Sequence, residues 1–176
     1  VANAILDGTD CVMLSGESAM GRYPIAAVEM LAAIAAAIEP HCSGRRLLEE
    51  TQSCVDAKET NLPDLIALGV ETTLQHITPV AVIVPTRSGT TARRIVRFRL
   101  PVWTVAVSSL EKTCQDLQFS YGVSPVCEPD HPTDWKTWIR RFLKDSGLSG
   151  DLVVLTEGPS KKHPERNNRM EIIDLR

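Results

Sequence analysis

The sequence predicts an α/β fold: a three-layer α/β/α sandwich on a five-stranded, mostly parallel sheet whose last strand is antiparallel. Three observations support this prediction. Hydrophobic residues make up 43% and charged residues 23% of the 176-residue chain, values typical of a globular protein. From residue 61 onward, β-branched runs alternate with segments of helical period, as in parallel βαβ units. The last two strands are joined by a polar loop with no helix, which favours an antiparallel pair.

The first forty residues carry one βα unit and the tail of the helix before it. The sequence opens on the end of a helix that Gly8 closes as a C-cap. The apolar run Asp10–Gly16, bounded by a Ser-Gly turn, predicts a strand buried on both faces. Pro24 occupies the first position of a helix whose apolar residues recur at helical spacing as far as Ile38, before Pro40 ends it.

A polar stretch over residues 41–60, with a short helical turn around Leu47, predicts a linker, and residues 61–176 predict the sandwich. Its expected elements are a helix opened by Asn61 or Pro63 that stops before Pro79, a strand Pro79–Thr86, a helix from Thr90 or Thr91, a strand Pro101–Ser109, a helix from Leu110 capped by Gly122, a strand from Val123, a helix capped by Thr133 or Asp134 that runs to Lys144, a strand Asp151–Gly158 and a strand Arg169–Leu175.

Charge and hydropathy exclude several classes of partner. The net charge of −3 gives no electrostatic reason to expect nucleic acid or an anionic membrane surface. The longest apolar run, Ile25–Ile38, is broken by Glu29 and is too short and too rich in alanine for a membrane span. No basic segment precedes an apolar one as in a signal peptide. The chain starts within a helical pattern, so we expect it to be a fragment of a longer protein.

The cysteines and histidines indicate neither a disulfide framework nor a metal site. The five cysteines are widely spaced and form no CxxC pair, and the four histidines have no carboxylate or cysteine at ligand spacing. We therefore expect reduced thiols, a cytoplasmic protein and no metal bound to this chain. The cysteines are Cys11, Cys42, Cys54, Cys114 and Cys127.

The first candidate site follows the first predicted strand. Ser15, Glu17 and Ser18 lie where a buried parallel strand ends and a helix approaches, which is the end of an α/β sheet or barrel where ligands bind. The alternative is ordinary capping, in which Ser and Glu satisfy free N–H groups at the start of a helix.

The second candidate is the loop from Thr86 to Thr91, between a strand and a helix. Hydroxyls of Thr86, Ser88, Thr90 and Thr91 converge there with the free N–H groups of a helix N-terminus. Gly89 allows close approach of the backbone, and Arg87 adds a cation. This combination predicts a phosphate site without a Walker or GxGxxG sequence. The alternative is a plain βα turn with Ser/Thr capping.

The third candidate is the basic loop Ser160–Arg169, between the last two strands. Its Lys161, Lys162 and Arg166 could serve an anion held by the Thr86–Thr91 loop if the sheet brings both loops to one edge. The alternative is a solvated hairpin loop. Two other groups are interpreted structurally: Arg93, Arg94, Arg97 and Arg99 as a solvated helix face, and Trp135 with Trp138 as packing residues.

The segment VANAILDGTDCVMLSGESAMGRYPIAAVEML closely resembles pyruvate kinases, which share its DG-DC-MLSGE core followed by YP. Weaker similarities follow. The family's Thr-x-Ser-Gly turn before an Ala-Arg helix matches Thr86 to Arg93, its Tyr-x-Gly-x-x-Pro-Val matches Tyr121 to Val126, and its Gly-Asp-x-Val-x-x-Thr-x-Gly strand matches Gly150 to Gly158. The resemblance spans essentially the whole chain.

The resemblance implies that residues 1–40 are a remnant of the catalytic (β/α)₈ barrel, residues 41–60 a linker, and residues 61–176 the C-terminal domain that forms subunit contacts and binds phosphorylated effectors. The intact enzyme transfers the phosphoryl group of phosphoenolpyruvate to ADP in glycolysis, with Mg²⁺ and K⁺, and is a homo-oligomer, commonly a tetramer. Ser15 and Glu17 would lie at the rim of its active site. The fragment itself has no cofactor, and its catalytic carboxylates, lysine and arginine would lie upstream.

Two departures from the family bear on these expectations. Met20 stands where the family often has lysine, and residues 161–168 replace the usual Gly-Ser-Gly and Thr-Asn loop, so the effector could differ from the usual sugar phosphates. We expect the chain alone to lack kinase activity and to self-associate through residues 1–40, because their apolar surface has lost its barrel neighbours. The alternatives are a free-standing phosphate-binding module and a purely structural oligomerisation module.

Overall fold

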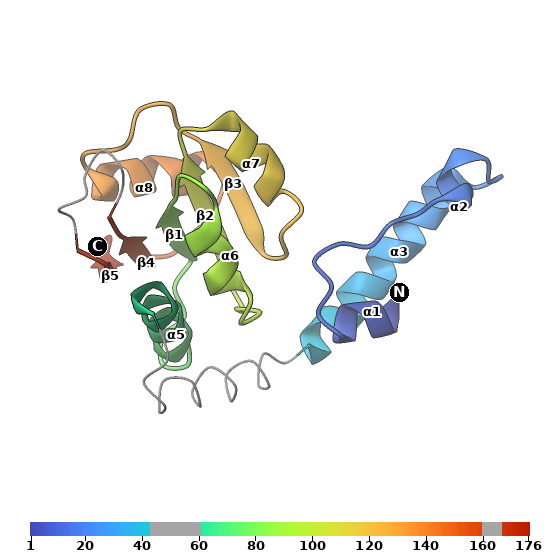
Figure 1. The fold of residues 1–176 in the computed structure, drawn as a ribbon, viewed down its shortest axis with the longest axis horizontal. Helices are drawn as coiled ribbons and strands as arrows, with labels where there is room; N and C mark the ends of the chain where they lie inside the picture. Colours follow the sequence, from blue (N-terminus) through green and yellow to red (C-terminus); the bar gives the residue numbers. More distant parts are fainter. Residues whose placement is uncertain (43–60, 160–166) are drawn as a thin grey trace. The chain divides into compact units, whose positions relative to one another are not determined.

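The computed structural model describes residues 1–42, 61–159 and 167–176, and the chain divides into two compact units (Figure 1). The first unit is Val1–Ser43 and the second is Gly44–Arg176. Most of the predicted linker, with the turn expected around Leu47, lies outside the described residues.

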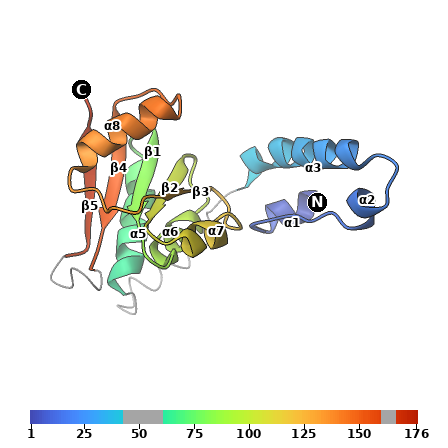
Figure 2. The same cartoon turned by 90° about the horizontal axis from the view of Figure 1, so that it is seen from above.

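The first unit is helical. It contains α1 (Ala2–Leu6), α2 (Gly16–Ala19), α3 (Pro24–Ile38) and the 3₁₀ helix η1 (Glu39–His41). Gly8 closes α1 as predicted: its φ is +91°, its N–H donates to Ile5 O at 3.0 Å, and the N–H of Thr9 donates to Ala4 O at 3.0 Å. This pair of bonds is a Schellman motif, which satisfies the last carbonyls of the helix. Figure 2 shows α1 and α2 alongside α3.

The prediction of a strand over Asp10–Gly16 is wrong. Residues 11–14 belong to no strand, and α2 begins at Gly16. A buried parallel strand needs a neighbour for its N–H and C=O groups. Within residues 1–42 no other strand is present to pair with it.

Helix α3 exposes its apolar side chains within this unit. Ile25, Val28 and Met30 are 74%, 53% and 62% exposed, and Ile5 is the one buried residue among residues 1–42. The segment Pro24–His41 is also long and apolar enough to cross a membrane by length and composition alone, which is weak evidence for a span. Helix α3 is therefore rich in apolar residues that the rest of its own unit does not bury.

The second unit has the predicted alternation of helices and strands. Its elements are α5 (Leu62–Leu74), β1 (Ala81–Pro85), α6 (Thr90–Val96), β2 (Trp103–Ser108), α7 (Glu111–Leu117), β3 (Val123–Cys127), α8 (Trp135–Asp145), β4 (Leu152–Glu157) and β5 (Arg169–Asp174). The strand order is β3-β2-β1-β4-β5. The first four strands are parallel and β5 is antiparallel to β4, which confirms the predicted sheet.

Alternate residues of the strands face two separate cores, so the unit has three layers (Figure 2). On one face, α5, α6 and α7 pack against β-branched residues such as Val82 and Val154. On the other face, α8 packs against Ile83, Val105 and Leu155. Fully burying a side chain of this size contributes about 1.5–3 kcal/mol, which explains why strand register and helix placement are fixed together.

Side chains begin two of the helices as the sequence indicates. Asn61 accepts the N–H of Asp64 at 3.1 Å and opens α5. Of the two residues proposed to cap α8, Asp134 is the one that does so, accepting the N–H of Thr137 at 3.2 Å. One predicted cap is wrong: α7 ends at Leu117, and Gly122, with φ +67°, turns the chain into β3 instead.

Candidate functional site

The Thr86–Thr91 loop lies at the carboxyl edge of the sheet, between β1 and α6. The N–H of Thr86 donates to Val107 O at 2.8 Å, which extends the β1–β2 pairing by one residue. The hydroxyl of Thr86 then accepts the N–H of Gly89 at 3.0 Å and folds the loop back on itself. The first N–H groups of α6 have no intrahelical partner, as in any helix, and they follow Gly89 directly.

Gly89 is the residue that lets the loop adopt this conformation. Its φ is +78°, in the left-handed region that favours glycine. A Cβ at this position would lie 2.9 Å from Leu117 Cδ2, so the loop is packed tightly on α7. The sequence predicted that Gly89 lets the backbone come close to a ligand. In the structure the backbone at Gly89 comes close to Leu117 of α7.

The exposed hydroxyls and cations of the loop are arranged around its tip. Ser88 Oγ and Thr90 Oγ1 are 2.9 Å apart. The guanidinium of Arg93 donates to Ser88 O at 3.3 Å. Arg87 is exposed beside them. The sequence placed Arg93 on a solvated face and did not include it in the site; its position one helical turn after Thr90 was the signal that could have found it.

The other arginines on and just after α6 have structural contacts. Asp64 on α5 forms ion pairs with Arg94 at 2.8 Å and with Arg97 at 3.3 Å, so the basic face joins α5 to α6. Arg99 lies over the ring of Tyr121, 4.0 Å from its centroid. The predicted solvated face is therefore only partly solvated.

Helix α7 supports the loop from beneath. The hydroxyl of Thr113 donates to Arg87 O at 2.8 Å, and Leu117 packs against Gly89. Thr113 and Leu117 are both buried. A displacement of α7 would consequently move the loop.

Strand β4 brings a second set of residues to the same edge. It pairs with β1 in parallel, Ile83 opposite Leu155, so its carboxyl end lies beside that of β1. The carboxyl ends of β1 and β4 therefore lie at the same edge of the sheet, as the suggested joint anion site of their two loops requires. Lys161, Lys162 and Arg166 themselves lie outside the described residues.

Glu157, the last residue of β4, lies at the same edge as the candidate site and was missed by the sequence analysis. Its side chain is only 6% exposed, and it pairs with Arg169 at the start of β5. It also accepts the indole N–H of Trp135 at 2.9 Å. Burial of a carboxylate is costly unless it is paired and hydrogen-bonded, and Glu157 is both. No pattern in the sequence marked this position.

In the first unit, Ser15 and Glu17 are close together and exposed. The N–H of Ser15 donates to Glu17 Oε2 at 3.0 Å. The carboxylate's bond to its own backbone N–H, followed by this bond from Ser15, lowers the pKa of Glu17. Ser15 is the N-cap of α2 but its side chain makes no capping bond. The geometry is that of a helix start without a side-chain cap from Ser15, and both the active-site rim and ordinary capping stay predictions. Met20 is exposed at the end of the same helix.

The described residues hold no cluster of three or more His, Cys, Asp or Glu side chains suited to a metal ion. The described cysteines, Cys11, Cys42, Cys114 and Cys127, are all free thiols.

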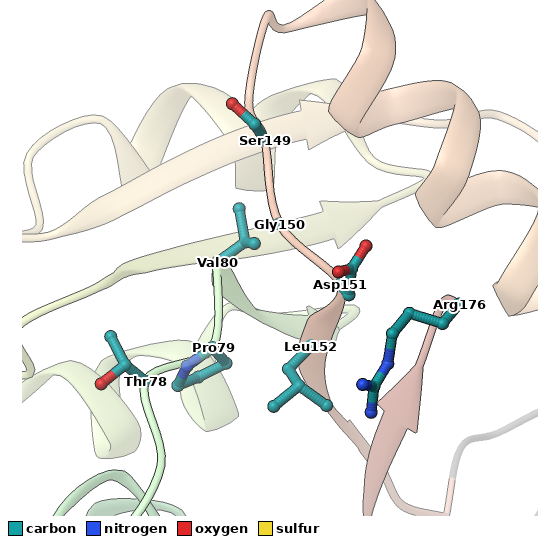
Figure 3. Close-up of a pocket in the computed structure, with 8 residues that line it drawn as sticks. All are labelled: Thr78, Pro79, Val80, Ser149, Gly150, Asp151, Leu152 and Arg176. Atoms are coloured by element: carbon teal, nitrogen blue, oxygen red, sulfur yellow. The ribbon is translucent and has the colours of Figure 1, made fainter.

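A cavity of about 400 Å³ lies at the opposite edge of the sheet, where β1 and β4 begin (Figure 3). Residues 78–80, residues 149–152 and Arg176 line it. None of the predicted site residues contributes to it. Arg176 donates a hydrogen bond to Asp174. Its guanidinium lowers the pKa of the Asp174 carboxyl to about 2.

Comparison with known families finds a matching family model for each of the two units. Residues 64–173 match the family model "Pyruvate kinase, alpha/beta domain", and residues 1–28 match "Pyruvate kinase, barrel domain". A pyruvate kinase of Thermococcus litoralis is 37% identical over 179 residues, covering 99% of this chain and 37% of the relative. One from Clostridium acetobutylicum is 40% identical over 162 residues, covering 90% of this chain and 34% of the relative.

Solved structures agree with these matches. Cryptosporidium parvum pyruvate kinase in complex with ADP superimposes with a TM-score of 0.81 at 26% identity, covering 99% of this chain and 36% of that one. The fold and the matched segments define the end of a barrel domain followed by an α/β domain. The chain belongs to the pyruvate kinase family. It spans between 26% and 37% of the length of the first curated relatives.

Proposed function

We propose that this chain serves as the C-terminal part of a pyruvate kinase, which transfers the phosphoryl group of phosphoenolpyruvate to ADP. Residues 1–40 contribute the end of the barrel, residues 41–60 the linker, and residues 61–176 the regulatory domain. The matches to both family domains, in this order along the chain, support the proposal. Mg²⁺ and K⁺ act in the whole enzyme, which is cytoplasmic and homo-oligomeric.

The chain by itself has no kinase activity, because the family's metal-binding carboxylates and catalytic lysine are not among its residues. Catalysis of phosphoryl transfer depends on positioning and on neutralising charge around the transferred group. Purified chain in a coupled assay with phosphoenolpyruvate, ADP, Mg²⁺ and K⁺ therefore gives no turnover above the blank. Turnover that scales with the concentration of chain would contradict this.

The regulatory domain binds a phosphorylated effector at Thr86–Thr91. The observation that carries this proposal is the loop's geometry: two hydroxyls 2.9 Å apart and the guanidiniums of Arg87 and Arg93, ahead of the first N–H groups of α6. Phosphate is favoured where backbone N–H groups, hydroxyls and guanidiniums converge. Lys161, Lys162 and Arg166 supply further cations from the β4–β5 loop.

Thermal-shift titration with fructose 1,6-bisphosphate, glucose 6-phosphate, ribose 5-phosphate and AMP tests the site. A ligand that binds only the folded chain raises the melting temperature saturably. Arg93→Gln should reduce that shift, whereas Lys144→Gln, which removes one positive charge from the exposed end of α8, should not. Equal losses in both variants would indicate non-specific charge attraction.

Two other functions remain as alternatives. A free-standing phosphate-binding module would bind effector without any barrel partner, but the barrel match over residues 1–28 favours the enzyme. A purely structural oligomerisation module would show no shift with any of the four ligands. That result would leave family membership intact and make the domain a scaffold.

A further inference from the structure

Two cysteines of the second unit meet at the carboxyl edge of the sheet. Cys127 is the last residue of β3 and lies opposite Ser108 of β2 in the parallel register. Cys114 belongs to α7, and its Sγ lies 3.9 Å from Ser108 O. Cys114 and Cys127 are thirteen residues apart in the sequence, and both lie next to Ser108, one from α7 and the other from β3.

The two thiols lie on either side of Ser108 and differ in access to solvent. Both are free thiols. Cys127 is exposed, whereas Cys114 is buried. Burial raises the pKa of the Cys114 thiol, and the adjacent Cys127 raises it further. The pair therefore combines a thiol that an oxidant can reach with a protected thiol beside it.

We propose that Cys114 and Cys127 are a redox modification site that forms a reversible intrachain disulfide and thereby adjusts the Thr86–Thr91 loop. The oxidant class is a low-molecular-weight disulfide such as oxidised glutathione. Neither the family matches nor the proposed effector site assigns a role to these residues.

The chemistry balances as two thiol–disulfide exchanges. The thiolate of Cys127 attacks one sulfur of oxidised glutathione, which forms a mixed disulfide and releases one glutathione thiolate. Cys114 then gives its proton to solvent and attacks the Cys127 sulfur, which breaks the mixed disulfide and releases the second glutathione. One protein dithiol and one oxidised glutathione become one protein disulfide and two reduced glutathione molecules. Excess reduced glutathione reverses both steps.

Helix α7 carries the effect to the loop. A disulfide holds its two sulfurs about 2 Å apart, so its formation draws Cys114 of α7 toward Cys127 of β3. Thr113, next to Cys114, donates to Arg87 O at 2.8 Å, and Leu117 packs on Gly89. The loop is held by the helix that the disulfide moves. This second half of the proposal rests on the loop being the effector site.

The disulfide itself is tested without any effector. Trypsin releases residues 113–136 as one peptide, because no lysine or arginine lies between Lys112 and Lys136, and this peptide contains these two cysteines and no other. After equilibration of the chain with oxidised glutathione and alkylation of remaining thiols, the peptide should lose two hydrogens and carry no alkyl group. Chymotryptic cleavage between the cysteines should leave two fragments that separate only on reduction.

Cys127→Ser is the control that keeps this test decisive. Its side chain is exposed, so the variant should fold, and Cys114 should then remain alkylatable under the same conditions once the chain is unfolded. Two alkylated cysteines in the unaltered chain would overturn the proposal. Accumulation of glutathione on Cys127 without loss of the Cys114 thiol would also overturn it.

Coupling is measured with inorganic phosphate and glucose 6-phosphate as probes. The oxidised chain should bind them about fivefold or more weakly than the reduced chain, within the usual range of coupling between sites, while Cys127→Ser shows no redox dependence. Equal affinities in both states would overturn the coupling but not the disulfide. Failure of the reduced chain to bind either probe would overturn the effector site, and the coupling with it, whereas the peptide result would stand.

Discussion

Trp135 on α8 donates its indole N–H to Glu157 Oε1 at the end of β4, over 2.9 Å, and both residues are buried. The other oxygen of the same carboxylate pairs with Arg169 on β5. One side chain thus joins the helix that covers this face of the sheet to both strands of the final hairpin. The edge of the sheet next to the proposed effector loop is held in place by this residue.

Replacing Glu157 with alanine should lower the free energy of unfolding by about 1–3 kcal/mol, because a buried indole N–H loses its acceptor. Glu157→Gln should cost less, since an amide oxygen can still accept that bond. The control is Glu171→Ala, which removes an exposed carboxylate 3.8 Å from the same Arg169 and should change stability by less than about 0.5 kcal/mol. Urea unfolding measures all three, and equal effects of the alanine variants would contradict the assignment.

Gly89→Ala should destabilise the second unit more than Gly147→Ala. Both glycines have positive φ, +78° and +66°, so alanine costs about 1–2 kcal/mol of backbone strain at either position. Only at Gly89 does the new Cβ also approach a buried side chain, 2.9 Å from Leu117 Cδ2. Thermal denaturation of the two variants compares the positions, and a larger loss at Gly147 would refute the packing argument.

Asp174 should make stability depend on pH in acid. Its hydrogen bonds with Arg176 lower the pKa from 3.8 to about 2, so the folded state favours the ionised carboxylate. The stabilisation is complete above the unfolded pKa of about 3.9 and is lost as the pH falls toward about 2. The difference in melting temperature between the unaltered chain and Asp174→Asn should therefore shrink over this interval. Arg176→Gln should abolish the same dependence; a difference that stays constant with pH would contradict it.

Helix α3 should drive self-association of the isolated chain. An exposed apolar surface of this kind recruits a partner, and a second copy is the partner always present in a purified sample. Analytical ultracentrifugation should detect dimers or larger species at a concentration on the order of tens of micromolar, which suits weak interfaces. Val28→Lys should weaken them, whereas Gln118→Lys, which adds the same charge at the exposed residue that follows α7, should not. A monodisperse monomer would refute the expectation.

Most of the second unit could be predicted from its sequence because local signals and packing agree there. Asn61 and Asp134 cap helices in sequence positions where such caps are recognisable, and the β-branched strands alternate between two cores. The antiparallel β5 followed from a connection with no helix. In each case the signal lies within a few residues of the element that it specifies.

The errors arose where the outcome depends on distant partners. The apolar run after Asp10 has the composition of a buried strand, but a strand forms only against a neighbour, and residues 1–42 supply none. Glu157 was missed because its acceptance of Trp135 and its pairing with Arg169 join residues 22 and 12 positions apart. The Thr86–Thr91 turn was found because its glycine and hydroxyls are consecutive.

The position of β4 inside the sheet has a consequence for synthesis on the ribosome. β1 lies at the centre, between β2 and β4, yet β4 follows it only after β2, β3 and α8 have been made. Until Leu152–Glu157 emerges, the nascent sheet presents one open edge of β1, with Val82 and Ile83 among its residues. Unpaired apolar edges are where growing chains misassociate. Slow translation between α8 and β4 would prolong that exposure, so this stretch is where chaperone capture of the nascent domain should be greatest.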